Sequence, residues 1–266
     1  MKVFCTGDTH RDISETYDRI NYFKKECAKN GTAFNDDIVL IILGDFGGNF
    51  GGGLNYRDHN FKQMLEEFGI NYFVIRGNHD QRPSKIFNGD TWHFEIFFDG
   101  PTFVENEFPH IHYAMDYPWI YNIEGNKTLV LPGAYSIDKN ERIYWEKKDN
   151  KPGAYWFKDE QMDSAEIEYA RTLCRLNNNK FDLILSHTCP ASFISKYSPN
   201  LSIINPPDHT MEMFFNELEH SLEYKTWIWG HHHEDCGYNF EGHHNACLYT
   251  YIYELNYIIK NGIEGF

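Results

Sequence analysis

Six short apolar runs, each cut off by a glycine or a polar cluster, constrain the fold of this 266-residue chain more than any other feature. Apolar runs of this length that end in glycine or polar residues are typical of buried β-strands. The runs are KVFCTGD (2–8), DIVLIILGD (37–45), NYFVIRGNHD (71–80), KTLVLPGAY (127–135), FDLILSH (181–187) and KTWIWGHHH (225–233).

Helical patterns lie between several of these runs. Asp163 and Thr210 are suitable starting residues for two of the helices. Strands that alternate with helices indicate a layered α/β fold. The tail, 246–259, alternates aromatic and β-branched residues and predicts late antiparallel strands. The predicted helices cover 13–29, 57–68, 162–176 and 210–223.

The domain organisation predicted for residues 1–266 is a single domain. Cores stop growing near ~250–300 residues, so this length fits one large domain or two small ones. The sequence shows no internal repeat and no long linker, which favours one domain. The least regular region, 80–126, is rich in aromatic residues and suggests an irregular cap or insertion.

Charge and cysteine usage narrow the class of protein. The net charge of −15 argues against binding long nucleic acid through a broad basic face, although metal ions can supply local positive charge. The six cysteines are scattered without a C-x-x-C pair, as in reduced cytoplasmic proteins. The N-terminus has no signal-peptide pattern, and no apolar run approaches the ~20 residues of a membrane helix. We therefore expect a cytoplasmic protein without a membrane segment.

Five of the strand ends carry Asp, Asn or His. Carboxylate, amide and imidazole side chains are the ligands that suit Mn, Fe or Zn. Ligands in open α/β sheets bind at the carboxyl edge, so the five strand ends are expected to converge. If these segments are extended, Asp8 and His10 point to the same side. The same alternation separates His231 and His233 from His232, which is then a spacer.

The order of these residues resembles the motif series of calcineurin-like metallophosphoesterases, D-x-H, G-D, G-N-H-(D/E), H and G-H-x-H. The resemblance runs from residue 8 to residue 233. It implies a four-layer α-β-β-α sandwich of two mixed sheets flanked by helices. The matching segments are Asp8-Thr9-His10, Gly44-Asp45, Gly77-Asn78-His79-Asp80, His187 and Gly230-His231-His232-His233.

The resemblance also implies a dinuclear metal centre holding two divalent ions, Mn, Fe or Zn. Asp45 bridges the two metals in this assignment. A metal-bridging hydroxide then attacks phosphorus in line. The first metal is held by Asp8, His10 and His233, and the second by Asn78, His187 and His231.

His79 matches the family histidine that is not a ligand and that protonates the leaving oxygen or steadies the transition state. Its neighbour Asp80 either orients that ring or caps the next segment. Candidates for substrate contact are Arg11, Asn78 and Arg142, with a solvated or ion-paired role as the alternative for both arginines.

Two departures separate the chain from eukaryotic protein phosphatases of the family. Those usually carry Gly after the first His and V-D-R-G after the second Asp, where this chain has Arg11 and Phe46-Gly47-Gly48. The stretch GDFGGNFGGG (44–53) is either a flap near the metals or a surface loop without a role.

The sequence therefore predicts a phosphoester hydrolase. The preferred substrate is a phosphomonoester, on a phosphoprotein or a small molecule. The first alternative is a phosphodiesterase acting on cyclic nucleotides or nucleic acid. An alternative of another class is a catalytically silent, metal-binding interaction module. The sequence does not predict an oligomeric state.

Overall fold

The strands form two mixed sheets in the computed structural model, which describes residues 1–50, 55–197, 208–240 and 242–263. The seven-stranded sheet has the order β13-β1-β2-β3-β6-β5-β4, in which β1, β2, β3 and β6 are parallel. Its strands are β1 (Lys2–Thr6), β2 (Ile38–Ile42), β3 (Asn71–Val74), β4 (Trp92–Phe97), β5 (Gly100–Glu105), β6 (Phe108–Ala114) and β13 (Tyr253–Glu254).

The six-stranded sheet has the order β11-β12-β10-β9-β8-β7. Its central strands β8, β9, β10 and β12 are parallel, while β7 and β11 pair antiparallel at the two edges. Its strands are β7 (Trp119–Ile123), β8 (Asn126–Leu131), β9 (Leu183–Ser186), β10 (Thr226–Trp229), β11 (Cys236–Phe240) and β12 (His243–Cys247).

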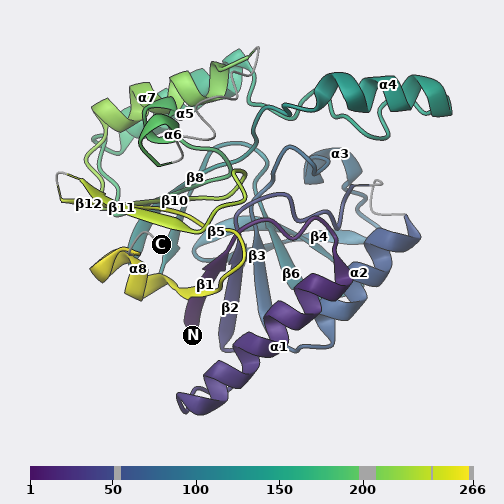
Figure 1. The fold of residues 1–266 in the computed structure, drawn as a ribbon, viewed down its shortest axis with the longest axis horizontal. Helices are drawn as coiled ribbons and strands as arrows, with labels where there is room; N and C mark the ends of the chain where they lie inside the picture. The colour runs from purple at the N-terminus through teal and green to yellow at the C-terminus, as the bar shows by residue number, and fades with distance from the viewer. Residues whose placement is uncertain (51–54, 198–207, 241, 264–266) are drawn as a thin grey trace.

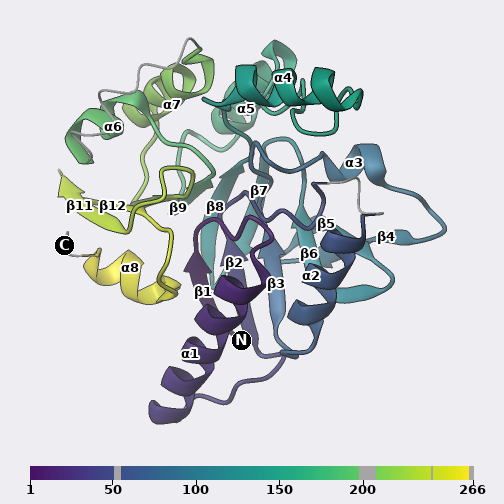
Figure 2. The ribbon, with the colours of Figure 1, turned by 45° about the vertical axis from the view of Figure 1, so that its right-hand side comes forward.

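Three apolar cores define the layers. The middle core joins the facing sides of the sheets and includes Val3, Val39 and Ile228. A second core packs α1 (Ile13–Lys29) and α2 (Tyr56–Glu66) against the outer side of the seven-stranded sheet. A third core packs α5 (Ser164–Leu176), α6 (Ala191–Tyr197) and α7 (Thr210–Ser221) against the outer side of the other sheet. The predicted four-layer sandwich is therefore confirmed (Figures 1 and 2).

Local signals explain where the main helices begin. The Asp12 carboxylate caps α1 by accepting a hydrogen bond from the Glu15 amide. Asp163 and Glu166 form a capping box at the start of α5, as the sequence led us to expect for Asp163. Three shorter or more peripheral helices are α3 (Pro83–Ile86), α4 (Lys139–Asp149) and α8 (Leu255–Asn261). In Figure 1, α4 extends away from the two sheets.

Two sequence predictions differ from the structure. The region 80–126 is not irregular, because it contains α3 and the strands β4 to β7. Its aromatic residues include Trp92 and Phe103, which are core residues rather than parts of a cap. In the tail, predicted to form antiparallel strands, Ala246 and Cys247 pair antiparallel with β11, and Tyr253 and Glu254 pair antiparallel with β1, but α8 begins at Leu255. Leu255 and Ile258 are buried at helical spacing in the middle core, and this packing overrides the alternating pattern.

Among the described residues, no helix is long and apolar enough to span a membrane.

Candidate metal centre

Seven side chains predicted as metal ligands lie together where strands of the two sheets end. Asp8 and His10 follow β1, Asp45 follows β2 and Asn78 follows β3. From the other sheet, His187 follows β9, and the pair His231 and His233 follows β10. The cluster therefore draws on both sheets and lies across the edge of the core between them.

The first group contains Asp8, His10 and His233. Nε2 of His233 lies 3.1 Å from Oδ2 of Asp8 and 2.8 Å from Nε2 of His10. Oδ2 of Asp8 is buried, and the hydrogen-bond geometry leaves it without a donor. A buried carboxylate oxygen without a donor is costly unless a cation binds it, so this group fits a metal ion.

The second group contains Asp45, His187 and His231. Nε2 of His187 lies 3.3 Å from Oδ1 of Asp45 and 2.9 Å from Oδ1 of Asn78. The other ring nitrogen, Nδ1, lies 2.7 Å from the carbonyl oxygen of Leu43, which fixes the orientation of the ring. Two carboxylates with histidines and one amide form a donor set suited to Mn, Fe or Zn.

Asp45 lies between the two groups. Its Oδ1 faces His187, while its Oδ2 lies 3.9 Å from Nδ1 of His10 and 3.6 Å from Nε2 of His79. Burial raises the pKa of Asp45, but His79 and His187 outweigh it and hold that pKa well below its usual range. The carboxylate is thus ionised, with one oxygen directed at each group.

Glycines bring these side chains close together. An alanine Cβ at position 44 would lie 2.1 Å from Nδ1 of His187. A Cβ at position 230 would lie 2.5 Å from Oδ1 of Asp8. Because real Cβ atoms do not approach other atoms so closely, only glycine permits this packing at Gly44 and Gly230.

The backbone at four of the seven candidate ligand positions is left-handed, not extended. The φ angles are 47° at His10, 47° at Asp45, 66° at His231 and 52° at His233. The prediction that alternation along an extended segment orients these side chains is therefore wrong. Each such residue costs of order 1–3 kcal/mol, and strain of this kind concentrates at functional sites.

The predicted separation of His232 from His231 and His233 arises from turns of the backbone and not from alternation along a strand. The turns place His231 beside His187 and His233 beside Asp8. His232 lies outside both groups but does not point away from the site, because it lines the same cavity as its neighbours. Its Nδ1 accepts a hydrogen bond of 3.2 Å from Nε1 of Trp229.

His79 lies beside the two groups, in contact with Arg142. The guanidinium NH2 of Arg142 is 2.7 Å from Nδ1 of His79, and its Nε donates to Oδ2 of Asp138 at 2.7 Å. Burial lowers the pKa of His79 to about 4, Asp45 opposes this shift, and Arg142 adds to it. His79 is therefore neutral at pH 7 in the absence of other ligands.

Two other predicted residues have structural partners. The Asp80 carboxylate accepts hydrogen bonds from the amides of Phe46, Gly47 and Gly77, at 3.1, 2.7 and 2.9 Å. These contacts favour the turn-stabilising role over orientation of the His79 ring. Arg11 forms an ion pair with the buried Asp58 and lies over the ring of Phe50. This geometry favours the ion-paired alternative for Arg11.

A model of the calcineurin-like phosphoesterase family matches residues 1–235. The chain belongs to this family. No curated protein matches the chain. Similar solved structures include a dimetal phosphatase from Danio rerio, with 13% identity and a TM-score of 0.48, covering 94% of this chain and 87% of that one. Another is a phosphopantetheinyl hydrolase from Mycobacterium tuberculosis, with 13% identity and a TM-score of 0.42, covering 94% and 90%.

In this calcineurin-like phosphoesterase, sequence reasoning missed a buried chain of hydrogen bonds behind Asn78. Nδ2 of Asn78 donates to Oγ of Ser136 at 2.9 Å, and Ser136 donates to Oε2 of Glu160 at 2.5 Å. Ser136 lies six residues before Arg142, a predicted substrate contact, but Glu160 carries no local signal. Of the glycine-rich stretch 44–53, residues 51–53 lie outside the described residues, and Phe46 is a core residue.

Proposed function

We propose that this chain is a dinuclear-metal-dependent phosphoester hydrolase that prefers phosphomonoesters of small molecules or proteins. The placement of Asp45 carries the proposal, because its two oxygens face the two groups of candidate ligands. Asp8, His10 and His233 would hold one ion, and Asn78, His187 and His231 the other. Two divalent ions bound there would polarise the phosphoryl oxygens and lower the pKa of the attacking water.

His79 is proposed to act on the leaving group. It lines the cavity beside the candidate ligands, and although its ring lies close enough to His10 and Asp45 to form a third possible group, the two groups above are complete without it. Its Nδ1 accepts a hydrogen bond from Arg142, which holds the ring in place, and its other nitrogen would donate a hydrogen bond to the leaving oxygen and steady the transition state. Replacing His79 by alanine should lower turnover ~10²–10⁴-fold while the metal content stays unchanged.

A control separates this role from metal binding. The Asp45→Asn variant should lose both activity and metal, because it removes the charge shared by the two ions. Full turnover by His79→Ala on a substrate with a poor leaving group would show that His79 is not the proton donor.

A panel of phosphoesters on metal-stripped protein tests the proposed function. Mn, Fe, Zn, Ni and Mg are added back separately, and p-nitrophenyl phosphate is compared with bis-p-nitrophenyl phosphate. We expect turnover of the monoester. Turnover of the diester alone would overturn the monoester preference, and tight metal binding without any turnover would support a catalytically silent module.

One observation favours a phosphodiesterase as the second candidate. His79 lines two hollows, a cavity of about 360 Å³ beside the metal ligands and a groove of about 350 Å³. The groove is also lined by Phe50, Arg142, Trp145 and Tyr155. A diester has two organic groups, and the two hollows offer one place for each.

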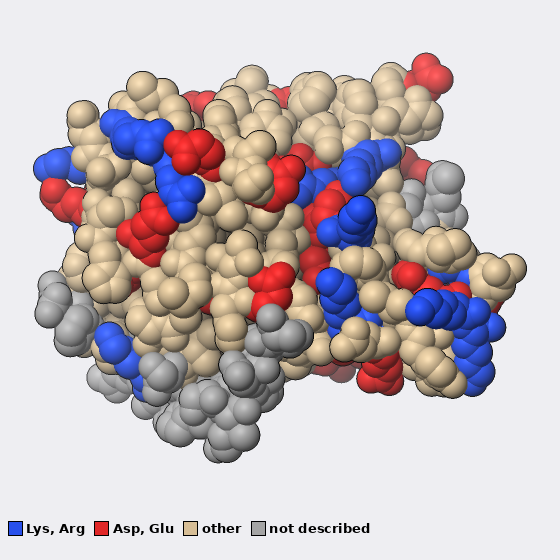
Figure 3. All heavy atoms as spheres, turned by 90° about the horizontal axis from the view of Figure 1, so that it is seen from above, with Lys and Arg blue, Asp and Glu red and all other residues tan. Residues whose placement is uncertain are grey.

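The surface argues against long nucleic acid as a substrate. In Figure 3, Lys and Arg on the visible face are interspersed with Asp and Glu. Arg171 pairs with Glu168 and Glu217 in this manner. With a net charge of −15, such a surface does not attract a polyanion. We propose a phosphorylated protein or small molecule as the partner. In a control titration with DNA, we expect only weak binding whose affinity does not change with salt concentration.

We also propose a cytoplasmic location and a single domain. All six cysteines are free thiols, the form that a reducing compartment maintains. Fractionation of cells that produce the protein tests this location.

The middle core contains residues of both sheets, such as Val3 and Ile228. A single domain should therefore unfold in one transition with equal calorimetric and van't Hoff enthalpies.

A further inference from the structure

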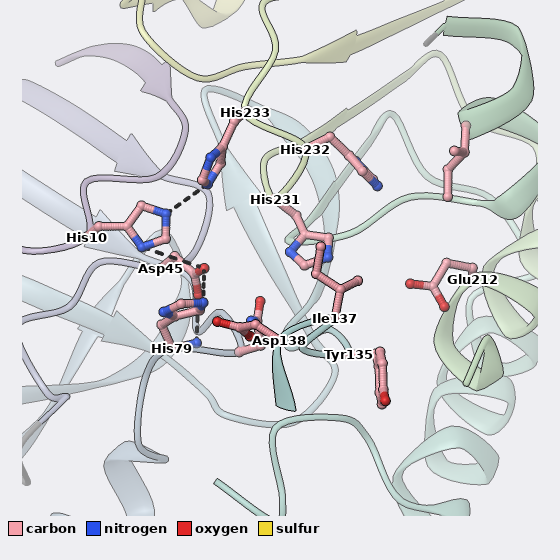
Figure 4. A pocket seen from close by; sticks show the side chains of 12 residues that line it. His10, Asp45, His79, Tyr135, Ile137, Asp138, Glu212, His231, His232 and His233 are labelled. Carbon is pink, nitrogen blue, oxygen red and sulfur yellow. Dashed lines mark hydrogen bonds and ion pairs between the residues drawn. The ribbon is translucent and has the colours of Figure 1, made fainter. Parts of the chain in front are cut away.

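The cavity beside the metal ligands extends to a second wall formed by other residues. Figure 4 shows Tyr135, Ile137 and Glu212 across the cavity from His10 and His233. Ile194 also lines the cavity, and Asp138 lies beside His79. No lysine or arginine is among the described residues that line the cavity. An organic group attached to a metal-bound phosphate would therefore meet apolar and acidic side chains.

Glu212 is the unusual member of this wall. It belongs to the first turn of α7, and the residue is only 4% exposed. Its Oε1 accepts a hydrogen bond of 3.2 Å from Oγ1 of Thr188, but its Oε2 has no hydrogen-bond partner among the described residues. Burial raises the pKa of Glu212, while its own amide, Thr188 and the nearby His209 oppose this shift, and no lysine or arginine among the described residues pairs with it. A carboxyl group that lines a cavity and has one buried oxygen without a partner is a site for a hydrogen-bond donor.

The neighbouring side chains favour a cationic donor over a neutral one. The ring of Tyr135, a residue that is 5% exposed, lines the same cavity and provides an aromatic surface. Ammonium groups bind aromatic faces and carboxylates together, while Ile137 and Ile194 suit a short alkyl chain.

We propose that this wall binds the alcohol portion of the substrate and selects phosphomonoesters of amino alcohols, whose ammonium group pairs with Glu212. The inference rests on the proposed function, since the phosphate would lie at the metal ligands. The substrate is then zwitterionic, with its phosphate at one end of the cavity and its amine at the other.

Matched series of substrates test this specificity. The kcat/KM values of ω-aminoalkyl phosphates, from aminoethyl to aminohexyl phosphate, are compared with those of n-alkyl phosphates of equal length. A charge-assisted hydrogen bond should favour the amine by ~10-fold or more at the chain length that spans the cavity. In Glu212→Gln this preference, measured as the ratio of amino to alkyl substrates within the variant, should fall to near one.

Glu219→Gln is the matched control, because Glu219 lies on the same helix and does not line the cavity. It should keep the preference for amines. Equal kcat/KM for amino and alkyl phosphates at every chain length, with p-nitrophenyl phosphate still hydrolysed, would overturn the amine site alone. No hydrolysis of any phosphoester by the unsubstituted protein would instead overturn the proposed function, and the substrate class with it.

Discussion

Removing the hydroxyl group of Ser136 should weaken metal binding although every candidate ligand remains. The hydroxyl accepts a hydrogen bond from Nδ2 of Asn78 and donates one to Glu160, at 2.9 and 2.5 Å. An amide has a donor side and an acceptor side, so this contact keeps Oδ1 of Asn78 directed at His187 and the proposed second ion. In Ser136→Ala the amide is free to rotate.

The size of the effect follows from the two lost contacts. The neutral hydrogen bond to Asn78 is worth about 1 kcal/mol, and the bond to the Glu160 carboxylate about 1.5–3 kcal/mol. Loss of an outer contact to a ligand typically lowers metal affinity ~10–100-fold. We expect this decrease at the second ion only. The free energy of unfolding should also fall by about 1–3 kcal/mol, because Oε2 of the buried Glu160 loses its donor while Oε1 keeps the backbone amide of residue 136.

Calorimetric titration of the metal-stripped protein resolves the two affinities, and activity is followed against metal concentration in parallel. Thr102→Val is the control, since Thr102 is fully buried and donates a 3.1 Å hydrogen bond to the carbonyl oxygen of Glu95 outside the candidate ligands. It should lower stability but leave both affinities unchanged. Wild-type affinity for both ions in Ser136→Ala would refute the positioning role.

Three further predictions concern the supporting structure. Gly230→Ala should displace Asp8, lower the metal content and reduce activity ~100-fold in phosphoester assays. Its circular dichroism spectrum should show little loss of helix. Lys62→Met should destabilise the fold by ~3–5 kcal/mol, because Glu105 is left without the buried ammonium that lies 2.6 Å away; adding Glu105→Gln should restore part of this in denaturant titrations. Burial lowers the pKa of His112 to about 4 from 6.5, so the unfolded chain takes up the proton first and stability falls as the pH drops from 6.5 to 4. His112→Phe should remove ~2 kcal/mol of that loss at pH 5, and equal acid sensitivity of both proteins would contradict this account.

Sequence reasoning worked best where chemistry and chain order sufficed. The apolar runs predicted the central strands, because burial on both faces leaves a continuous apolar pattern. The strand ends then brought Asp8 and Asp45 to the carboxyl edge of one sheet and His187 to that of the other, since parallel strands share a carboxyl edge. The local geometry was not predictable in this way, because left-handed turns at His10 and His231 are imposed by packing rather than by residue type.

Long-range contacts account for the rest of what the sequence did not show. Glu160 and Glu212 carry no motif, and each becomes informative only when the fold buries it beside the site. The strands in 80–126 were missed because their aromatic residues fill a core and do not alternate cleanly. Leu255 starts a helix for a related reason, since its burial depends on sheets formed by distant segments.

The division of the ligands between the two sheets has a consequence for assembly. The strands β1 to β6 build most of one sheet before β7 begins the other, so the chain consists of two consecutive halves that meet face to face. An ion held by Asp8 and His233 would link these two halves. A disulfide that closes a very long loop makes a comparable link and stabilises the folded state by about 4–5 kcal/mol. If the chain is cut between Asp116 and Trp119, the two fragments should bind each other with higher affinity in the presence of metal than in the presence of a chelator. The proposed metal centre would then also hold the two halves of the fold together.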